Sequence, residues 1–214
     1  MKVEVIDLRG EPCELRAGQW RRADVREVGS HVGICGHQVG SEVGALRADR
    51  KRYGPTMAVA RRFLRWPYHV GAGVACGQPF VVIAHPFERY THHGDAANQG
   101  YLGFAVAGRF PMFEANRAKR HGIRPGADLV AAVHEALTVL CEMSIEAGHD
   151  GALDFITHRQ AQNSRHDDRD ADPGEWLCRA VASSPAVESG LVIPQPDRVL
   201  VDGAGLPWPA GWRG

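Results

Sequence analysis

Histidine is the residue type that stands out in this chain, with 11 copies among 214 residues. Two of them, His37 and His158, follow short apolar runs that are typical of buried strands, and Asp172 precedes a Pro-Gly pair. Strands hold the side chains at their ends rigidly, so these positions are well suited to building a site. Two imidazoles and one carboxylate can hold a catalytic zinc ion and leave a fourth position for water.

The same three residues also have a simpler interpretation. A histidine at a strand end is usually a hydrogen-bonded polar residue, and an aspartate before Pro-Gly more often makes a turn or caps a helix. His37 and His158 lack a short metal-binding spacing such as HExxH. Residue types and spacing alone therefore leave both interpretations open, a metal site and ordinary polar residues.

Hydrophobic patterns predict the elements that must position these side chains. Short apolar or alternating runs predict strands at 31–37, 68–74, 80–84, 101–107 and 153–157. Helical periodicity and proline placement predict helices at 56–66, 128–147 and 173–182. Asp128 is the expected cap of the second helix, and Gly148 is its expected end. This order of elements predicts a single α/β domain in which helices flank a central mixed β-sheet.

Composition excludes several classes of protein. Lys and Arg total 25 and Asp and Glu total 25, so no net basic charge is available for binding nucleic acid. No apolar run is long enough to span a membrane. The first ten residues lack the apolar core of a signal peptide, which predicts a cytoplasmic protein. The five cysteines are odd in number and form no CxxC pair, which predicts reduced thiols.

Four short blocks with chemistry-bearing residues occur along the chain. They read GHQV at 36–39, PYHV at 67–70, HHGDAAN at 92–98 followed by LGFAVAG at 102–108, and FITHRQ at 155–160 followed by DPG at 172–174. In this order they resemble the zinc-dependent N-acetylmuramoyl-L-alanine amidases of the type 2 family, relatives of phage endolysins and peptidoglycan recognition proteins. The resemblance implies an amidase-like domain at 1–182, with a motif core at 32–176 and a Pro-rich tail at 183–214.

The resemblance also implies a ligand set, a substrate and a reaction. His37, His158 and Asp172 would bind Zn²⁺. The substrate would be peptidoglycan or its muropeptide fragments, cleaved by metal-activated water at the amide between N-acetylmuramic acid and L-alanine. Tyr68 matches a position where some family members carry an active-site tyrosine, whose hydroxyl would donate to the developing oxyanion. Packing within the sheet is the alternative role for Tyr68.

Four further residues are expected to bind substrate or to lie behind the ligands. His69 and His93 would orient ligands or line the groove, or would only be hydrogen-bonded loop residues. Asn98 is expected to hold its own loop. Arg165 would supply a positive charge to the site, or would be an ordinary surface arginine.

The chain departs from the family pattern in three ways. Ala105 stands where many members have glutamate, and Asp170 stands where many have lysine. The segment between His158 and Asp172 is long, which makes Asp168 a rival third ligand.

These departures keep two other interpretations open. One is a noncatalytic peptidoglycan-binding module on the same scaffold, and the other is a structural protein that keeps the fold without zinc. For an amidase, the missing signal peptide fits a phage lysin released to the cell wall by another agent. It fits equally an enzyme of cytosolic wall recycling.

Overall fold

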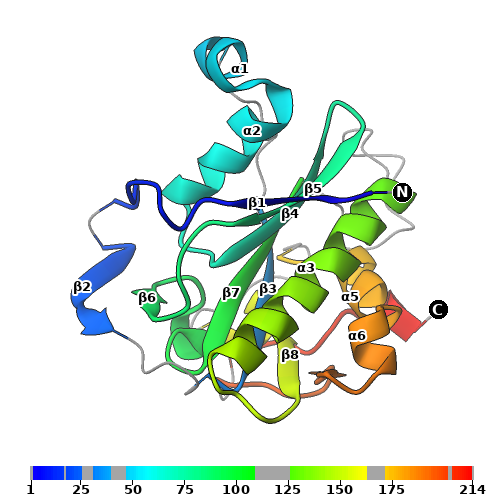
Figure 1. The fold of residues 1–214 in the computed structure, drawn as a ribbon. Helices are drawn as coiled ribbons and strands as arrows, with labels where there is room; N and C mark the ends of the chain where they lie inside the picture. The colour runs from blue at the N-terminus through cyan, green and yellow to red at the C-terminus, as the bar shows by residue number, and fades with distance from the viewer. Residues whose placement is uncertain are drawn as a thin grey trace.

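A seven-stranded mixed β-sheet forms the centre of the structure (Figure 1). The computed structural model describes residues 2–16, 18–25, 31–39, 47–108, 126–162, 172–201 and 204–213. In spatial order the strands are β1 (Glu4–Asp7), β5 (Gln78–Ile83), β4 (Val70–Ala75), β7 (Tyr101–Ala107), β3 (Gly33–Val39), β8 (Leu153–Thr157) and β9 (Val192–Pro194). Neighbouring strands are parallel except β4 and β5, which form an antiparallel hairpin. A small second sheet pairs β2 (Trp20–Val25) with β6 (Arg89–Thr91).

Helices and short helical turns connect and cover these strands. They are α1 (Arg47–Tyr53), α2 (Pro55–Ala60), η1 (Arg61–Arg65), η2 (Asp95–Ala97), α3 (Ala127–Glu146), α4 (His158–Ala161), α5 (Glu175–Ala182), α6 (Pro185–Glu188) and η4 (Ala210–Arg213). The longest helix, α3, lies across one face of the sheet (Figure 1). None of the helices in the described part of the chain is both long and apolar enough to cross a membrane.

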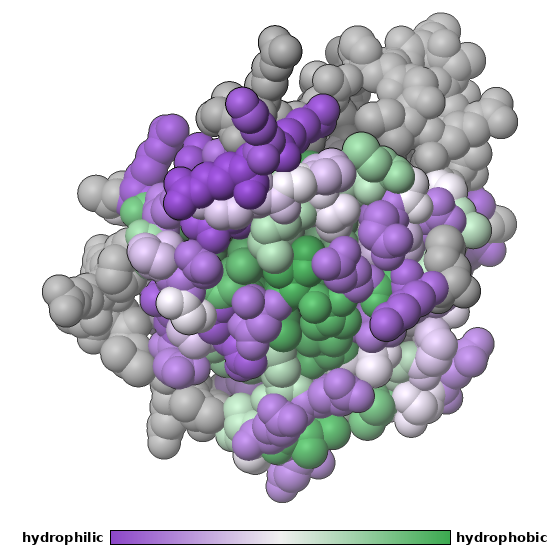
Figure 2. All heavy atoms as spheres, turned by 45° about the horizontal axis from the view of Figure 1, so that its top comes forward, coloured by the Kyte–Doolittle hydropathy of each residue, from purple (hydrophilic) through white to green (hydrophobic). Residues whose placement is uncertain are grey.

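The alternation of side chains along the strands separates two cores. Leu102, Phe104 and Val106 of β7 are fully buried in the core that includes α3 and α5. The next position, Ala105, belongs to a second core with Phe63 and Leu64 of η1. Period-2 alternation therefore directs alternate residues of one strand into separate helical layers. Figure 2 shows an apolar area of the surface surrounded by hydrophilic side chains.

The predicted fold class is confirmed, since a mixed sheet with flanking helices is what the structure contains. The close packing that the small residues of β3 indicated is also present. A Cβ added at Gly36 would lie 2.5 Å from the Phe155 ring of the neighbouring strand. The five cysteines are free thiols, as expected.

Some predicted boundaries were wrong. The strand that carries His37 extends to Val39, so His37 lies within β3 and not after it. Asp128 is not the cap of α3, because the helix begins one residue earlier and Gly126 is its N-cap. Asp128 lies in the first turn instead, where its charge still interacts favourably with the helix N-terminus.

The division between an amidase-like domain at 1–182 and a tail at 183–214 stays a prediction. The described part of the tail contains α6 and the edge strand β9, which pairs with β8.

His85, which follows β5, gives a test of how burial couples stability to pH. Its Nε2 donates to the Trp66 carbonyl and its Nδ1 accepts from Arg89 Nη1, both at 2.9 Å. Burial lowers the pKa of His85 to about 4, aided by the Arg89 charge and opposed by the Trp66 carbonyl. The unfolded chain takes up a proton near pH 6.5 that the folded protein does not. The stability that neutral His85 contributes is therefore complete above that pH and is lost as the pH falls towards 4.

We expect acidification from pH 7 to pH 4.5 to cost the wild type about 2–3 kcal/mol more than the variant His85→Gln, which cannot titrate. Urea unfolding of the metal-free proteins at both pH values measures this difference. Equal losses in the two proteins would contradict the assignment.

Candidate metal centre

The carboxyl ends of β3 and β8 bring two distant histidines together. The two strands are parallel neighbours, paired from Gly33 to Gly36 on β3 and from Asp154 to Thr157 on β8. His37 follows on β3, and His158 begins α4 directly after β8. Their ring centroids are 4.6 Å apart. Parallel strands end at the same edge of a sheet, which explains why sequence separation does not keep these residues apart.

Asp172 completes the group. Its Oδ1 accepts from the backbone N–H of Gln38 at 2.9 Å, and its Oδ2 lies 2.7 Å from His158 Nδ1. The same carboxylate lies 3.9 Å from His37 Nδ1. The donor atoms of His37, His158 and Asp172 all lie within 4.8 Å of one another, so the structure brings all three predicted ligands together.

The spacing of these atoms suits a tetrahedral metal ion. Nitrogen and oxygen ligands at about 2.0–2.2 Å from zinc lie roughly 3.3 Å from each other. The separations of 2.7 and 3.9 Å from Asp172 to the two imidazoles lie on either side of that value. The side chains of His158 and Asp172 are 20% and 28% exposed, so the group can be reached from solvent.

His37 Nδ1 is the atom that most requires a ligand. The residue is fully buried, and Nδ1 has no hydrogen-bond partner in the described part of the chain. An unsatisfied buried polar atom costs about 1–3 kcal/mol. A cation held between this atom and Asp172 would remove that cost, so the residues present fit a metal ion.

The protonation states of this group also suit a cation. Burial lowers the pKa of His37 to about 4, and the neighbouring His158 lowers it further, although Asp172 opposes both. Burial alone would raise the pKa of Asp172, but the hydrogen bond with His158 and the close approach of the His37 ring outweigh it, and the net pKa is lowered. At neutral pH the protein therefore presents a neutral imidazole and an ionised carboxylate, the forms that bind metals.

Tyr68 lies beside His37, two residues before β4 begins. Its ring centroid is 4.8 Å from that of His37, and the partly buried side chain packs against the core of η1. Burial raises the pKa of the Tyr68 hydroxyl, with a further contribution from the charge of Asp172. Tyr68 therefore keeps its proton at neutral pH and can act as a hydrogen-bond donor.

His69 and Asn98 act on the framework around the site. His69 Nδ1 accepts from the N–H of Gly103 at 3.0 Å, and Nε2 donates to the carbonyl of Arg89 at 2.9 Å. Asn98 Oδ1 accepts from the N–H groups of His93 and Gly94 at 2.8 and 2.7 Å. These bonds hold β7, β6 and the loop 92–98 in place. Arg165, Asp168 and Asp170 lie outside the described residues.

A second group of potential ligands lies behind His37 and includes a residue that the sequence interpretation missed. The donor atoms of Cys35, His37 and His93 also lie within 4.8 Å of one another. These residues are 0%, 0% and 5% exposed, so this group is closed to substrate. Burial raises the pKa of the Cys35 thiol, which disfavours the thiolate that metals bind. Cys35 and His37 are two positions apart on a strand and therefore share a face of the sheet, and this spacing was the signal that could have identified Cys35.

Ala105 lies directly beside His37. The two residues are paired in register on β7 and β3, so their side chains share a face of the sheet. Ala105 is fully buried, and β7 carries no acidic side chain. The position beside His37 on β7 therefore offers no carboxylate.

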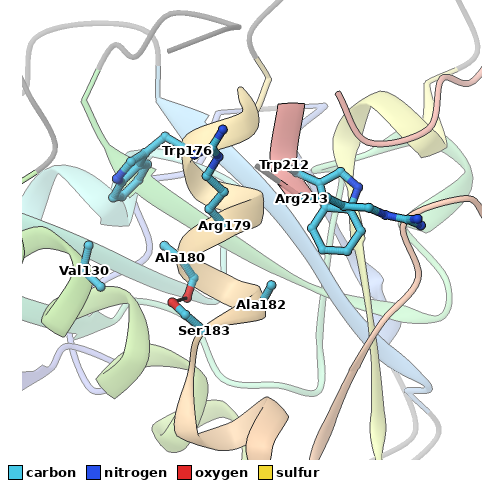
Figure 3. A pocket seen from close by; sticks show the side chains of 8 residues that line it. All are labelled: Val130, Trp176, Arg179, Ala180, Ala182, Ser183, Trp212 and Arg213. Atoms are coloured by element: carbon cyan, nitrogen blue, oxygen red, sulfur yellow. Dashed lines mark hydrogen bonds between the residues drawn. The ribbon is translucent and has the colours of Figure 1, made fainter. Parts of the chain in front are cut away.

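A hollow of 560 Å³ lies along α5 (Figure 3). It is lined by Val130, Trp176, Arg179, Ala180, Ala182, Ser183, Trp212 and Arg213. None of the predicted site residues lines it.

No protein-family model and no curated protein matches the sequence. Solved structures share the fold. A Drosophila PGRP-LB mutant in complex with tracheal cytotoxin has a TM-score of 0.53 and 15% identity, over 85% of this chain and 94% of that chain. Drosophila peptidoglycan recognition protein SD has a TM-score of 0.52 and 16% identity, over 86% and 96%. The endolysin amidase LysCS from Clostridium intestinale has a TM-score of 0.44 and 12% identity, over 80% and 87%, and supports no conclusion about this chain.

Gln160 tests how α4 holds His158. Its Oε1 accepts from Thr157 N, Thr157 Oγ1 and Trp208 Nε1 at 2.7, 2.9 and 2.8 Å. Its Nε2 donates to the carbonyls of Gln195 and Arg198. We expect Gln160→Leu to lower the free energy of unfolding by about 2–4 kcal/mol, because these buried partners lose their bonds.

Urea denaturation measures the loss for Gln160→Leu. Ser189→Ala is the control, because it removes an exposed hydroxyl bonded to one carbonyl and is expected to change stability little. If the two variants lose equally little stability, Gln160 does not anchor α4.

Proposed function

We propose that this chain is a zinc-dependent amidase that hydrolyses the amide between N-acetylmuramic acid and L-alanine in peptidoglycan. The observation that carries the proposal is the buried Nδ1 of His37, which faces Asp172 and His158 without a hydrogen bond from the described residues. The four sequence blocks support the substrate class, and so does the fold shared with PGRP-LB, whose structure contains tracheal cytotoxin. The proposal covers a phage lysin and an enzyme of wall recycling, since both cleave the same bond.

His37, His158 and Asp172 would hold the zinc ion. When bound, zinc would activate a water molecule and polarise the carbonyl of the scissile amide. His37 is neutral and Asp172 is ionised at neutral pH, so both already have the forms that bind a metal ion. The exposed fractions of His158 and Asp172 leave one side of the group open to substrate.

Tyr68 is the candidate for stabilising the oxyanion. It lies against the His37 ring and keeps its proton at neutral pH, so its hydroxyl can donate a hydrogen bond where negative charge develops. Ala105 offers no carboxyl group beside His37. The leaving amine must therefore take its proton from water or from another side chain of the site.

A noncatalytic peptidoglycan-binding module is the second candidate function. The observation that favours it is Ala105, which replaces a carboxylate next to a ligand. Zinc content and amide cleavage, measured on the same preparation, distinguish the two functions.

The ligand set is tested by zinc stoichiometry. We expect about one zinc ion per wild-type chain by mass spectrometry of the metal, and a large loss in His158→Ala and Asp172→Asn. Asp168→Asn should retain zinc, which separates the two candidate third ligands. His134→Ala is the matched control, because this histidine lies on α3 and bonds to the Ala180 carbonyl. Full zinc occupancy in both ligand variants would remove the proposed site.

The reaction is tested by release of L-alanine peptides from purified peptidoglycan. We expect release by the wild type and a loss of about 10²-fold in kcat for Tyr68→Phe, with zinc content unchanged, because one oxyanion donor is removed. Wild-type protein that holds zinc but releases nothing between pH 5 and 9 would exclude the amidase and leave the binding module.

A further inference from the structure

The two ring nitrogens of His37 face opposite surroundings. Nδ1 points to the open side, 3.9 Å from Asp172 Oδ1. Nε2 points to the closed side, 3.3 Å from Nδ1 of His93. A neutral imidazole carries its proton on only one nitrogen, so only the other nitrogen can offer a lone pair to a metal ion.

The backbone carbonyl of Tyr101 determines which nitrogen that is. It lies 3.0 Å from His93 Nε2. A carbonyl can only accept a hydrogen bond, so His93 carries its proton on Nε2 and presents a lone pair at Nδ1. That lone pair accepts from the Nε2–H of His37, which leaves the lone pair of His37 on Nδ1.

We propose that His93 is a positioning residue that fixes the tautomer of His37, so that the Nδ1 lone pair faces Asp172 and His158. The inference depends on the proposed function only in taking this open side of His37 as the metal-binding side. Partners that hold a metal-ligating imidazole in one tautomer typically change metal affinity by about 10–100-fold when they are removed.

The surroundings of His93 hold its ring in this position. A Cβ added at Gly103 would lie 2.9 Å from Cγ of His93, so the imidazole packs directly against a bare strand backbone. Asn98 fixes the main chain of His93 from the other direction through its bond to the His93 N–H. His93 is 5% exposed, and water therefore does not compete effectively for the bond to His37.

A metal ion between Cys35, His37 and His93 would require the opposite tautomer. His37 would then use Nε2 as the ligand atom and would carry its proton on Nδ1, towards Asp172. Asp172 Oδ1 at 3.9 Å is too far to accept a hydrogen bond from that proton. The observed distances therefore favour His93 as a hydrogen-bond acceptor over His93 as a metal ligand.

Two variants of similar shape isolate the acceptor. His93→Asn places an amide oxygen near the position of Nδ1 and can accept from His37, whereas His93→Leu cannot. We expect zinc affinity, measured by competition with a chromophoric chelator, to fall about 10–100-fold in His93→Leu and to be largely restored in His93→Asn. His134→Leu, which removes another carbonyl-bonded histidine, should bind zinc like the wild type. Equal affinity in wild type and His93→Leu would overturn the proposal.

The tautomer itself can be read in the metal-free wild type, which needs no variant of His93 to fold. Multiple-bond ¹H–¹⁵N NMR, with His37 signals assigned from their loss in His37→Gln, should show a protonated Nε2 and an unprotonated Nδ1 at pH 7. The opposite tautomer would exclude the role of His93. This readout does not involve amide cleavage or bound metal, so it is separate from a failure of the proposed function.

Discussion

The burial of the His37 imidazole is the constraint on which the rest of the site depends. A polar ring with no solvent exposure needs a partner at each nitrogen, and an unmet nitrogen costs about 1–3 kcal/mol. His93 meets one nitrogen, while the other faces a carboxylate and an imidazole without a hydrogen bond from the described residues. An apolar side chain at position 37 would carry no such cost. The polar ring therefore points to a ligand that binds at Nδ1.

The topology of the sheet brings His37 and His158 together although they lie far apart in the sequence. β3 lies between β7 and β8, and all three run parallel, so their carboxyl ends form one edge. Gln38 holds Asp172 through a backbone N–H, and Gln160 fastens α4 to the C-terminal segment. A slip of one residue in β3 would turn His37 towards the layer of α3, because successive strand residues face opposite sides. The strand register is thus a requirement of the site as well as of the core.

The sequence predicted those features of the fold that follow from the repeat of hydrophobic residues within one strand or helix. The alternation of Leu102, Phe104 and Val106 was sufficient to assign one face of β7 to the core. The extension of β3 to Val39 was not predictable, because that end depends on pairing with the last residues of β7. The contact of His93 with His37 could not be predicted either, because it requires the loop 92–98 to pack against the backbone at Gly103, which has no side chain. Residue types could identify candidate ligands, but only tertiary packing sets the nitrogen that each one presents.

The two sides of the His37 ring differ in exposure and in what each can do. The closed side, with Cys35, His93 and the Tyr101 carbonyl, excludes water and so can hold a proton at one nitrogen. The open side, with His158 and Asp172, is exposed enough to exchange a ligand or a substrate. Ala105 makes the adjacent wall apolar, which strengthens the interaction of nearby charges and offers no proton donor. Position 105 therefore bears on proton transfer beside His37, whereas the capacity to hold a metal ion rests on the donor atoms of His37, His158 and Asp172.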